Sequence, residues 1–358
     1  MTAEPVRLLF QRWPALAPNL PFVLLGNFPT PLEERPELAI ALGVDALTLK
    51  REDLSAADYG GNKIRKLEFL LGDAIAQNRQ HIVTFGGFGS NHAIATALNS
   101  RKFGLHCTAV LTPEPITDQV RAALARHIEL GTRVVVADQY GGVRAAAAAV
   151  IAEYGAEHCY EIPFGGSSWT GALGFVEGAL ELAEQIRTGE GRRPDVIYLA
   201  CGTTGTVAGL ALGLTLAGLD CRIEAVQVTP DSLQQDRLVV KLIEQAAHEL
   251  QARGGPHIDT AHAIALVHIR NDQLGEGYAE PTAAGRDAAE RWHRACELPV
   301  SLTYTAKALA ALVADAAAGQ LQGREVLFWN TYNSRPYVPP TDTDWSVLPL
   351  ELQRLLQA

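Results

Sequence analysis

Short strand-like segments alternate with amphipathic, helix-length segments along most of this 358-residue chain. Within 62–78, for example, Ile64, Leu67, Leu70 and Leu71 recur at helical spacing. Strands are predicted at 45–50, 81–85, 106–111, 133–137, 195–200, 222–228, 263–268 and 325–329, and helices at 62–78, 91–103, 117–130, 143–154, 205–217, 231–253, 281–296 and 305–318. Because this alternation is typical of βαβ units, it predicts an α/β fold with mostly parallel sheets and ligands at the carboxyl ends of strands.

The length of the chain favours one large or two moderate domains. A glycine-rich stretch at 163–168 indicates a crossover between domains. We therefore expect a smaller α/β domain at 55–165 and a larger domain built from 1–54 and 166–358.

Composition excludes several classes of protein. The net charge of −10 argues against nucleic-acid binding, which needs a basic surface. No apolar run reaches the roughly 18 residues of a membrane helix, and the N-terminus lacks the pattern of a secretory signal. The five cysteines are scattered and form no CxxC pair, so we expect no disulfide framework, no metal site and a cytoplasmic location.

The segment 59–70 is the most informative motif, because a glycine pair there leads into a lysine at the start of a helix. Gly60 and Gly61 permit a sharp turn, and Asn62 is a suitable helix cap. Lys63 would then lie near a helix N-terminus, where burial and the helix dipole favour the neutral amine that imine chemistry needs. The alternative is an ordinary solvated lysine, and Lys66, nearly one turn later, is the local competitor.

The stretch 84–92 predicts a strand-to-helix turn with three glycines before Ser90, Asn91 and His92. Backbone N–H groups at such a turn form an anion site suited to a substrate carboxylate. Asn91 could bind a cofactor hydroxyl, and Ser90 could lie beside the reacting carbon. The alternative is that Ser90 or Asn91 only caps the next helix.

A second glycine-rich turn, Cys-Gly-Thr-Thr-Gly-Thr at 201–206, joins a predicted strand to a predicted helix. Glycines permit close backbone approach, and threonine hydroxyls add donors for a phosphate at the helix start. The turn is neither a P-loop nor a dinucleotide-binding fingerprint, which argues against an NAD enzyme. An ordinary tight turn remains the alternative.

Together these motifs resemble the fold-type II pyridoxal phosphate (PLP) enzymes, a two-domain fold like that of the tryptophan synthase β subunit. The resemblance runs from about residue 20 to 335 and is greatest to the family of D-cysteine desulfhydrase and 1-aminocyclopropane-1-carboxylate (ACC) deaminase. It rests on Gly-Gly-Asn-Lys at 60–63, Ser-Asn-His at 90–92, the glycine/threonine turn, Gly277-Tyr278, and Tyr-Thr-Ala-Lys at 304–307. It implies PLP held between two domains, and a homodimer.

The resemblance also implies roles for individual residues. Lys63 is expected to form the Schiff base, with Ser90, Tyr278 and Tyr304 as further catalytic residues. The remaining cofactor-binding residues are expected to be Asn91, Gly202, Thr203, Thr204, Gly205, Thr206, Thr305 and Thr331, and the substrate-binding residues Ser90, Asn91, His92 and Trp169. Thr305 stands where ACC deaminases have glutamate and desulfhydrases threonine, which favours elimination over cyclopropane opening.

The chain departs from the family pattern at several places. Gly89 replaces a glutamine that helps to hold the substrate carboxylate, and Trp169 replaces a smaller residue. The segment 330–333 reads Asn-Thr-Tyr-Asn instead of His-Thr-Gly-Gly. We therefore expect the cofactor site to be retained and the substrate pocket to be specialised.

The predicted activity is PLP-dependent α,β-elimination from a small amino acid, which gives a 2-oxo acid and ammonia. Lys63 would remove the Cα proton, and Tyr304, Tyr278 or Ser90 would protonate the leaving group. The alternatives are ACC ring opening, β-replacement in a biosynthetic pathway, and a non-catalytic PLP-binding protein.

Overall fold

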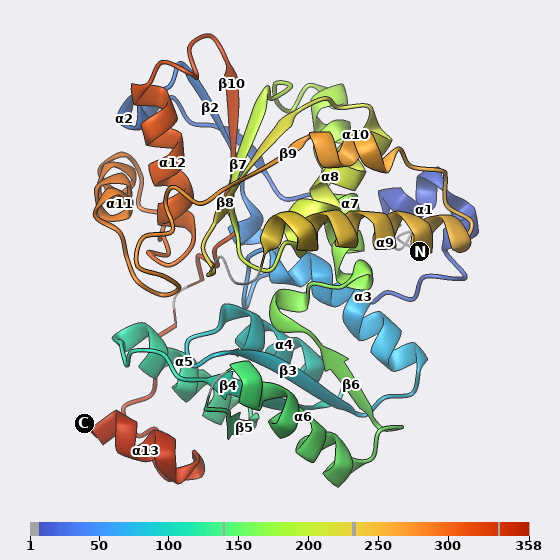
Figure 1. Cartoon of the computed structure of the whole chain (residues 1–358), viewed down its shortest axis with the longest axis vertical. Helices are drawn as coiled ribbons and strands as arrows, with labels where there is room; N and C mark the ends of the chain where they lie inside the picture. Colours follow the sequence, from blue (N-terminus) through green and yellow to red (C-terminus); the bar gives the residue numbers. More distant parts are fainter. Residues whose placement is uncertain (1–6, 139, 231–233, 336, 358) are drawn as a thin grey trace. The chain divides into compact units, whose positions relative to one another are not determined.

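The computed structural model describes residues 7–138, 140–230, 234–335 and 337–357, which form two compact units (Figure 1). The first unit comprises the described residues within Met1–Leu20, Gly26–Lys66 and Ser168–Arg335. The second comprises those within Pro21–Leu25, Leu67–Ser167 and Pro336–Ala358. Each unit contains its own sheet.

The first unit is built on a six-stranded sheet in the order β1-β2-β10-β7-β8-β9. Its strands are β1 (Leu32–Glu34), β2 (Ala46–Lys50), β7 (Val196–Cys201), β8 (Arg222–Gln227), β9 (Val267–Arg270) and β10 (Glu325–Trp329). Only the β1–β2 pair of this sheet is antiparallel. The parallel strands therefore end together at one edge, where the turns that follow β7 and β10 lie.

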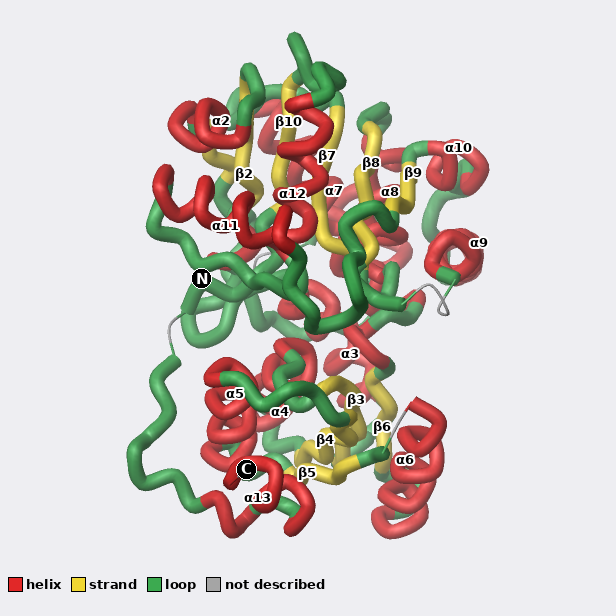
Figure 2. The backbone as a smooth tube through the Cα atoms, turned by 60° about the vertical axis from the view of Figure 1, so that its left-hand side comes forward, coloured by secondary structure: helices red, strands yellow, loops and turns green. Residues whose placement is uncertain are grey.

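Helices cover both faces of this sheet (Figure 2). They are α1 (Leu8–Arg12), α2 (Pro36–Leu42), α7 (Trp169–Thr188), α8 (Gly205–Ala217), α9 (Gln235–Ala252), α10 (Thr260–Ala265), α11 (Ala283–Ala295) and α12 (Thr305–Ala317), with short 3₁₀ turns η1 (Pro14–Leu16) and η2 (Glu52–Leu54). Helices α2, α11 and α12 pack with the strands around Trp292 and Phe328, and the opposite face carries α7, α8, α9 and α10. Helix α3 (Lys63–Ala76) begins in this unit and continues into the second.

The second unit has a four-stranded parallel sheet in the order β5-β4-β3-β6. Its elements are β3 (His81–Gly87), α4 (Asn91–Lys102), β4 (His106–Thr112), α5 (Asp118–Glu129), β5 (Arg133–Val136), α6 (Tyr140–Tyr154), β6 (Cys159–Ile162), η3 (Phe164–Gly166), η5 (Trp345–Val347) and α13 (Leu350–Gln357). Side chains alternate along β4, since Ala109 and Leu111 join the cluster with α4 and α5 while Val110 packs towards α6. This alternation buries both faces of the sheet.

The α/β class and the mostly parallel sheets are as predicted, and most predicted elements lie where they were expected. The predicted strand at 263–268 is wrong in its first half, because α10 occupies residues 260–265 and β9 begins only at Val267. Helix α7, 20 residues long, was not predicted. The first three residues of the helix predicted at 231–253 lie outside the described residues.

The two compact units differ from the domain bounds predicted from the sequence. The second unit begins at Leu67 on α3, and it also takes in 21–25 and the described residues after 335. The reason is packing: Leu348 and Leu352 from the C-terminal segment are buried in the same cluster as β4 and α5. The chain returns to the first unit at Ser168, within the glycine-rich stretch.

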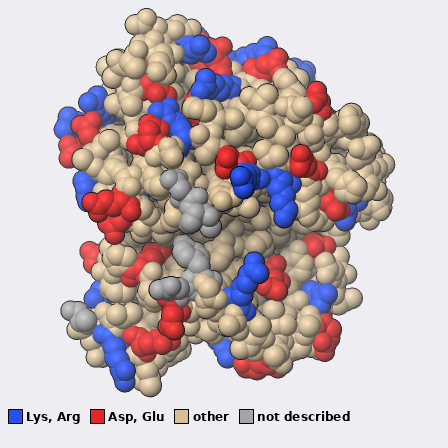
Figure 3. Space-filling view, viewed as in Figure 1, with Lys and Arg blue, Asp and Glu red and all other residues tan. Residues whose placement is uncertain are grey.

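The surface in Figure 3 carries acidic and basic side chains intermixed over the face shown. Among the described residues, no helix is both long and apolar enough to cross a membrane. In the same part of the chain, no group of three or more histidine, cysteine, aspartate or glutamate residues is placed to hold a metal ion.

Candidate active site

The turn before Lys63 requires both of its glycines. A Cβ atom on Gly60 would lie 1.9 Å from the carbonyl oxygen of Asp53. Gly61 has a φ of +96°, and a Cβ atom there would lie 2.9 Å from the carbonyl oxygen of Thr331. Because backbone atoms block both positions, only glycine fits at either of them. The turn places Lys63 as the first residue of α3.

Asn62 connects Lys63 to two other predicted site segments. The Lys63 amine donates to Asn62 Oδ1 at 2.8 Å. Asn62 Nδ2 donates to Thr206 Oγ1 at 3.1 Å, and the Asn62 backbone N–H donates to the Thr331 carbonyl at 3.1 Å. From the sequence Asn62 was expected only to cap a helix, whereas the structure makes it the bridge between lysine, glycine/threonine turn and Thr331.

Burial perturbs the pKa of both lysines in this segment. It lowers the pKa of Lys63 from 10.5 to about 8, which raises the neutral fraction of the amine near neutral pH. Burial also holds the pKa of Lys66 well below its usual value, with the nearby charge of Lys63 as a further cause. The thiol of Cys201 opposes this lowering of the Lys66 pKa.

The turn between β7 and α8 has the form of an anion cradle. Thr204, the N-cap residue of α8, adopts a φ of +64°, and its side chain makes no capping hydrogen bond. Helix α8 is 13 residues long, so the N–H groups of its first turn and its dipole favour a bound anion. A Cβ atom added to Gly202 would make only ordinary van der Waals contact, with its nearest neighbour, Thr229 Cγ2, at 3.9 Å. These features fit a phosphate group.

Two residues that the sequence did not single out hold this turn in place. The Gly202 carbonyl accepts hydrogen bonds from Thr229 Oγ1 and Gln235 Nε2, each at 3.0 Å. Gln235 Nε2 also donates a hydrogen bond to Thr229 Oγ1. Their contacts are far apart in the sequence, so no local pattern could have revealed them.

The two predicted active-site tyrosines form a pair. The hydroxyl groups of Tyr278 and Tyr304 are hydrogen-bonded, and their rings meet edge to face with centroids 6.0 Å apart. Lys307, which is fully buried, donates from its amine to the carbonyls of Leu274 at 2.7 Å and Gly277 at 2.9 Å. The amine therefore anchors the loop that carries Tyr278.

The hydroxyl of Thr305 is used locally. Its Oγ1 accepts the Ser301 N–H at 2.9 Å and lies 3.4 Å from the Ser301 carbonyl, to which it donates. By contrast, Ser301 Oγ and Asn330 Nδ2 are buried without a hydrogen-bond partner among the described residues. Buried polar atoms of this kind are usually satisfied, so both are candidates to contact a ligand. The predicted role of Thr305 at the cofactor stays a prediction.

Trp169 is the first residue of α7, after Ser168 as helix cap. The guanidinium of Arg253 lies over its ring at 4.3 Å from the centroid. This contact explains how the indole is held, and its predicted role in substrate binding stays a prediction.

In the second unit, Ser90, Asn91 and His92 open helix α4. Ser90 Oγ accepts the Ala93 N–H at 3.3 Å, so Ser90 is the helix cap. His92 is buried, with Nε2 3.2 Å from Thr84 Oγ1 on β3. These contacts are structural, and they leave the catalytic and binding roles predicted for the three residues untested.

The expected anion site on this turn is partly filled by the protein itself. The Phe88 N–H donates to the carbonyl oxygen of Thr112 at 3.1 Å, and the Ser90 N–H donates to the carbonyl oxygen of Gly87 at 3.0 Å. The Gly89 N–H donates to the side chain of Glu114, a residue that the sequence did not single out. A substrate carboxylate at this turn would therefore meet a carboxyl group already in place.

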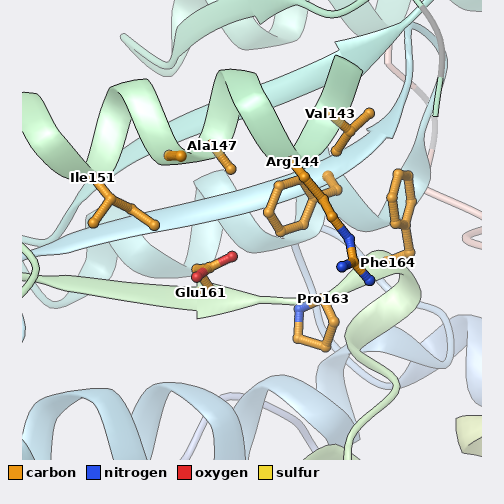
Figure 4. Close-up of a pocket in the computed structure, with 9 residues that line it drawn as sticks. Val143, Arg144, Ala147, Ile151, Glu161, Pro163 and Phe164 are labelled. Carbon is orange, nitrogen blue, oxygen red and sulfur yellow. The ribbon is translucent and has the colours of Figure 1, made fainter. Parts of the chain in front are cut away.

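A groove of about 510 Å³ in the second unit lies between α6 and the edge strand β6 (Figure 4). Its lining is mainly apolar, with Arg144 and Glu161 as the charged side chains. It is lined by none of the residues predicted for the active site.

The structure thus links Lys63, Asn62, Thr206 and Thr331 by direct hydrogen bonds in the first unit. The tyrosine pair belongs to the same unit, as does Trp169. Ser90 and its neighbours belong to the second unit, together with Glu114.

Comparisons with known proteins agree with this chemistry. Residues 23–331 match the family described as "Pyridoxal-phosphate dependent enzyme". D-cysteine desulfhydrase from Salmonella typhimurium is 34% identical over 303 residues, which cover 83% of this chain and 88% of the relative. A second D-cysteine desulfhydrase, from Salmonella newport, is also 34% identical, over 302 residues that cover 82% of this chain and 88% of the relative.

Solved structures show the same fold. A structure described as an ACC deaminase homologue is 28% identical with a TM-score of 0.74, and the alignment covers 89% of this chain and 93% of that one. Threonine deaminase isoform 2 from Solanum lycopersicum shares the fold at 14% identity, with a TM-score of 0.57 and coverage of 92% and 87%. The predicted fold class is confirmed. The chain is an enzyme that belongs to the pyridoxal-phosphate dependent family, and its cofactor is PLP.

Proposed function

We propose that this enzyme is a lyase that catalyses α,β-elimination from a small amino acid, in the manner of D-cysteine desulfhydrase, and releases a 2-oxo acid and ammonia. The observation that carries the proposal is the environment of Lys63. Its amine is partly neutral because it is buried, and Asn62 ties it to the glycine/threonine turn. The identity to D-cysteine desulfhydrase along most of both chains supports the choice of reaction.

The cofactor would be held by residues already described. Lys63 is its covalent partner, and the turn Gly202, Thr203, Thr204, Gly205 and Thr206 receives the phosphate. By the family likeness, Asn91 binds the ring hydroxyl, and Thr305 and Thr331 bind the cofactor as well.

Bound there, PLP supplies a ring that stabilises negative charge at the substrate Cα. The neutral Lys63 amine accepts the Cα proton, which requires a pKa near the working pH. Tyr304, Tyr278 or Ser90 then protonates the departing β-substituent. Because the two tyrosine hydroxyls are bonded to each other, one stabilises the other as it loses its proton. His92 and Trp169 are proposed to shape the substrate pocket.

ACC ring opening is the second candidate, because an ACC deaminase homologue has a similar structure. Thr305 argues against it. ACC deaminases have a carboxylate at this place, whereas the Thr305 hydroxyl is engaged with the Ser301 backbone. β-Replacement remains the alternative within the same chemistry, and a PLP-binding protein without turnover is the alternative outside it.

A substrate panel tests the proposal. The purified protein with PLP would be assayed with both enantiomers of cysteine, serine and β-chloroalanine, and with ACC, while 2-oxo acid and ammonia are measured. We expect pyruvate from a β-substituted amino acid, loss of activity in Lys63→Ala, and full activity in Lys241→Ala, which changes an exposed lysine on α9. Turnover of ACC alone, or a substituted amino acid formed in the presence of added thiol, would select an alternative. A protein that binds PLP without any turnover would refute the proposal.

We also propose a homodimer, from the family likeness, and a cytoplasmic location, from the scattered cysteines. Sedimentation of the purified protein tests the first part, and a monomer at micromolar concentration would contradict it.

A further inference from the structure

Glu114 lies against the glycine turn that precedes Ser90. It belongs to the short connection between β4 and α5. A Cβ atom on Gly87 would lie 1.5 Å from Glu114 Oε1, and one on Gly89 would lie 3.2 Å from Oε2. Oε1 is buried and has no hydrogen-bond partner among the described residues. The carboxyl group therefore fills the space beside the turn, and one of its oxygens is left there without a hydrogen bond.

Position 89 is crowded for any side chain. A glutamine in its place would bring its Cβ within 3.1 Å of Val120 and 3.2 Å of the Glu114 carboxyl group. The glutamine amide that the family resemblance predicts beside the substrate carboxylate is absent. A carboxyl group from a different loop stands beside the same turn.

We propose that Glu114 is a specificity residue of this turn, and that its protonated carboxyl group donates a hydrogen bond to the substrate carboxylate. Substrate binding then takes up one proton at pH values where Glu114 is ionised in the free enzyme. The inference rests on the proposed function, because it assumes an amino-acid substrate whose carboxylate binds at this turn.

The surroundings of Glu114 favour the protonated form. Burial raises its pKa from 4.5 to about 7, and the hydrogen bond from the Gly89 N–H opposes this rise. The turn 86–91 carries no titratable side chain. On the adjoining helix starts the titratable groups are His92 on α4 and Asp118 and Arg121 on α5, and none of them is among the causes of the shift.

A substrate carboxylate would strengthen this preference, because two neighbouring carboxylates share a proton rather than both ionise. The protonated acid then offers the donor that an amide would have offered. Above a pKa of about 7, each pH unit should weaken substrate binding about tenfold, since the proton must be supplied on binding.

The test is calorimetric binding of glycine and D-alanine to the holoenzyme. Neither amino acid has a β-leaving group, so binding is measured without elimination. Titrations at pH 6 and pH 8.5, in buffers of different ionisation enthalpy, count the protons taken up. Because the substrate amine and the cofactor also titrate, the readout is the difference between wild type and Glu114→Gln, with Asp118→Asn as an exposed-charge control on α5.

At pH 8.5 the wild type and Asp118→Asn should take up about one proton more than Glu114→Gln. From pH 6 to 8.5 their affinity should fall about 30-fold more than that of the glutamine variant, given a pKa of about 7. Parallel pH profiles in wild type and Glu114→Gln would overturn the inference, as would failure of the holoenzyme to bind either amino acid.

Should Glu114→Gln not fold, Glu114→Ala gives the same comparison, and proton uptake that persists in it would overturn the inference. The substrate panel is a separate measurement. A wild type that binds glycine with about one proton more than Glu114→Gln takes up, and yet eliminates no substituent, would refute the proposed function and support the role of Glu114.

Discussion

Replacing Lys307 with methionine should slow turnover without affecting cofactor binding. The Lys307 amine donates to the carbonyls of Leu274 and Gly277, directly before Tyr278. Methionine retains most of the side-chain volume and removes both donors. The change therefore tests whether this loop must be held for Tyr278 and Tyr304 to act.

The magnitude follows from the two bonds. A hydrogen bond with a charged partner contributes about 1.5–3 kcal/mol, and desolvation of the buried amine offsets part of it. A net loss of about 3 kcal/mol would reduce the anchored population of the loop about 150-fold relative to other conformations. General acid catalysis contributes roughly 10²–10⁴-fold to the rate, and Tyr278 can take part in it only while the loop is anchored. We therefore expect kcat to fall about 100-fold.

The assay is steady-state elimination together with a PLP titration. Lys241→Met, on the exposed face of α9, is the matched control and should behave as wild type. The affinity for PLP should stay within about twofold of wild type, because the phosphate turn is held by other residues. An unchanged kcat in Lys307→Met would refute the reasoning, and so would an equal loss in the control.

Three further outcomes are expected. Tyr304→Phe and Tyr278→Phe should both lower kcat relative to wild type, by about 100-fold for the tyrosine that donates the proton and by less for its partner. If both variants kept the wild-type kcat, neither tyrosine would be the acid. The rate at which apoenzyme combines with PLP should rise with pH to a midpoint near 8, because the neutral Lys63 amine reacts, whereas a midpoint near 10.5 would contradict the burial of that amine. Glu181→Gln should lower the free energy of unfolding at pH 7 by about 3 kcal/mol, because Lys50 and Arg65 lose a buried partner. The pKa of Glu181 is lowered to about 2 in the folded chain, so this stabilisation is present above about pH 4.5 and disappears as the pH falls towards 2. A variant as stable as wild type at pH 7 would refute this prediction.

The sequence predicted elements well where turn residues delimit them. Helix α8 has the predicted bounds of 205–217, with Gly205 at its start and Gly218 in a left-handed conformation at its end. Helix α7 was missed because glycines are unfavourable in helices. The structure shows why they are there, since a Cβ atom on Gly174 would lie 2.2 Å from the carbonyl oxygen of Arg65.

The segment 263–268 shows the limit of periodicity. A short apolar run is compatible with a strand or a helix, and local capping decided the outcome. Asp259 accepts the His262 N–H at 3.1 Å, so the chain begins α10 there and reaches the sheet only at Val267.

Candidate site residues could be predicted where they belong to short contiguous motifs. Lys63 and the turn 202–206 follow from glycine patterns that leave few other conformations. The contacts of Glu114 and Lys307 were not predictable, because each is made with a loop that is distant in sequence. Their signal is a polar group buried against backbone, which only the folded chain reveals.

Reduction of the holoenzyme with borohydride, followed by peptide mapping, tests the central claim most directly. The chain has six lysines, at positions 50, 63, 66, 102, 241 and 307, so the modified residue can be identified without ambiguity. The account predicts a visible absorption band that disappears on reduction, and a single cofactor-labelled peptide that contains Lys63. A label on Lys66 or on another lysine, or no band after PLP is added, would contradict it.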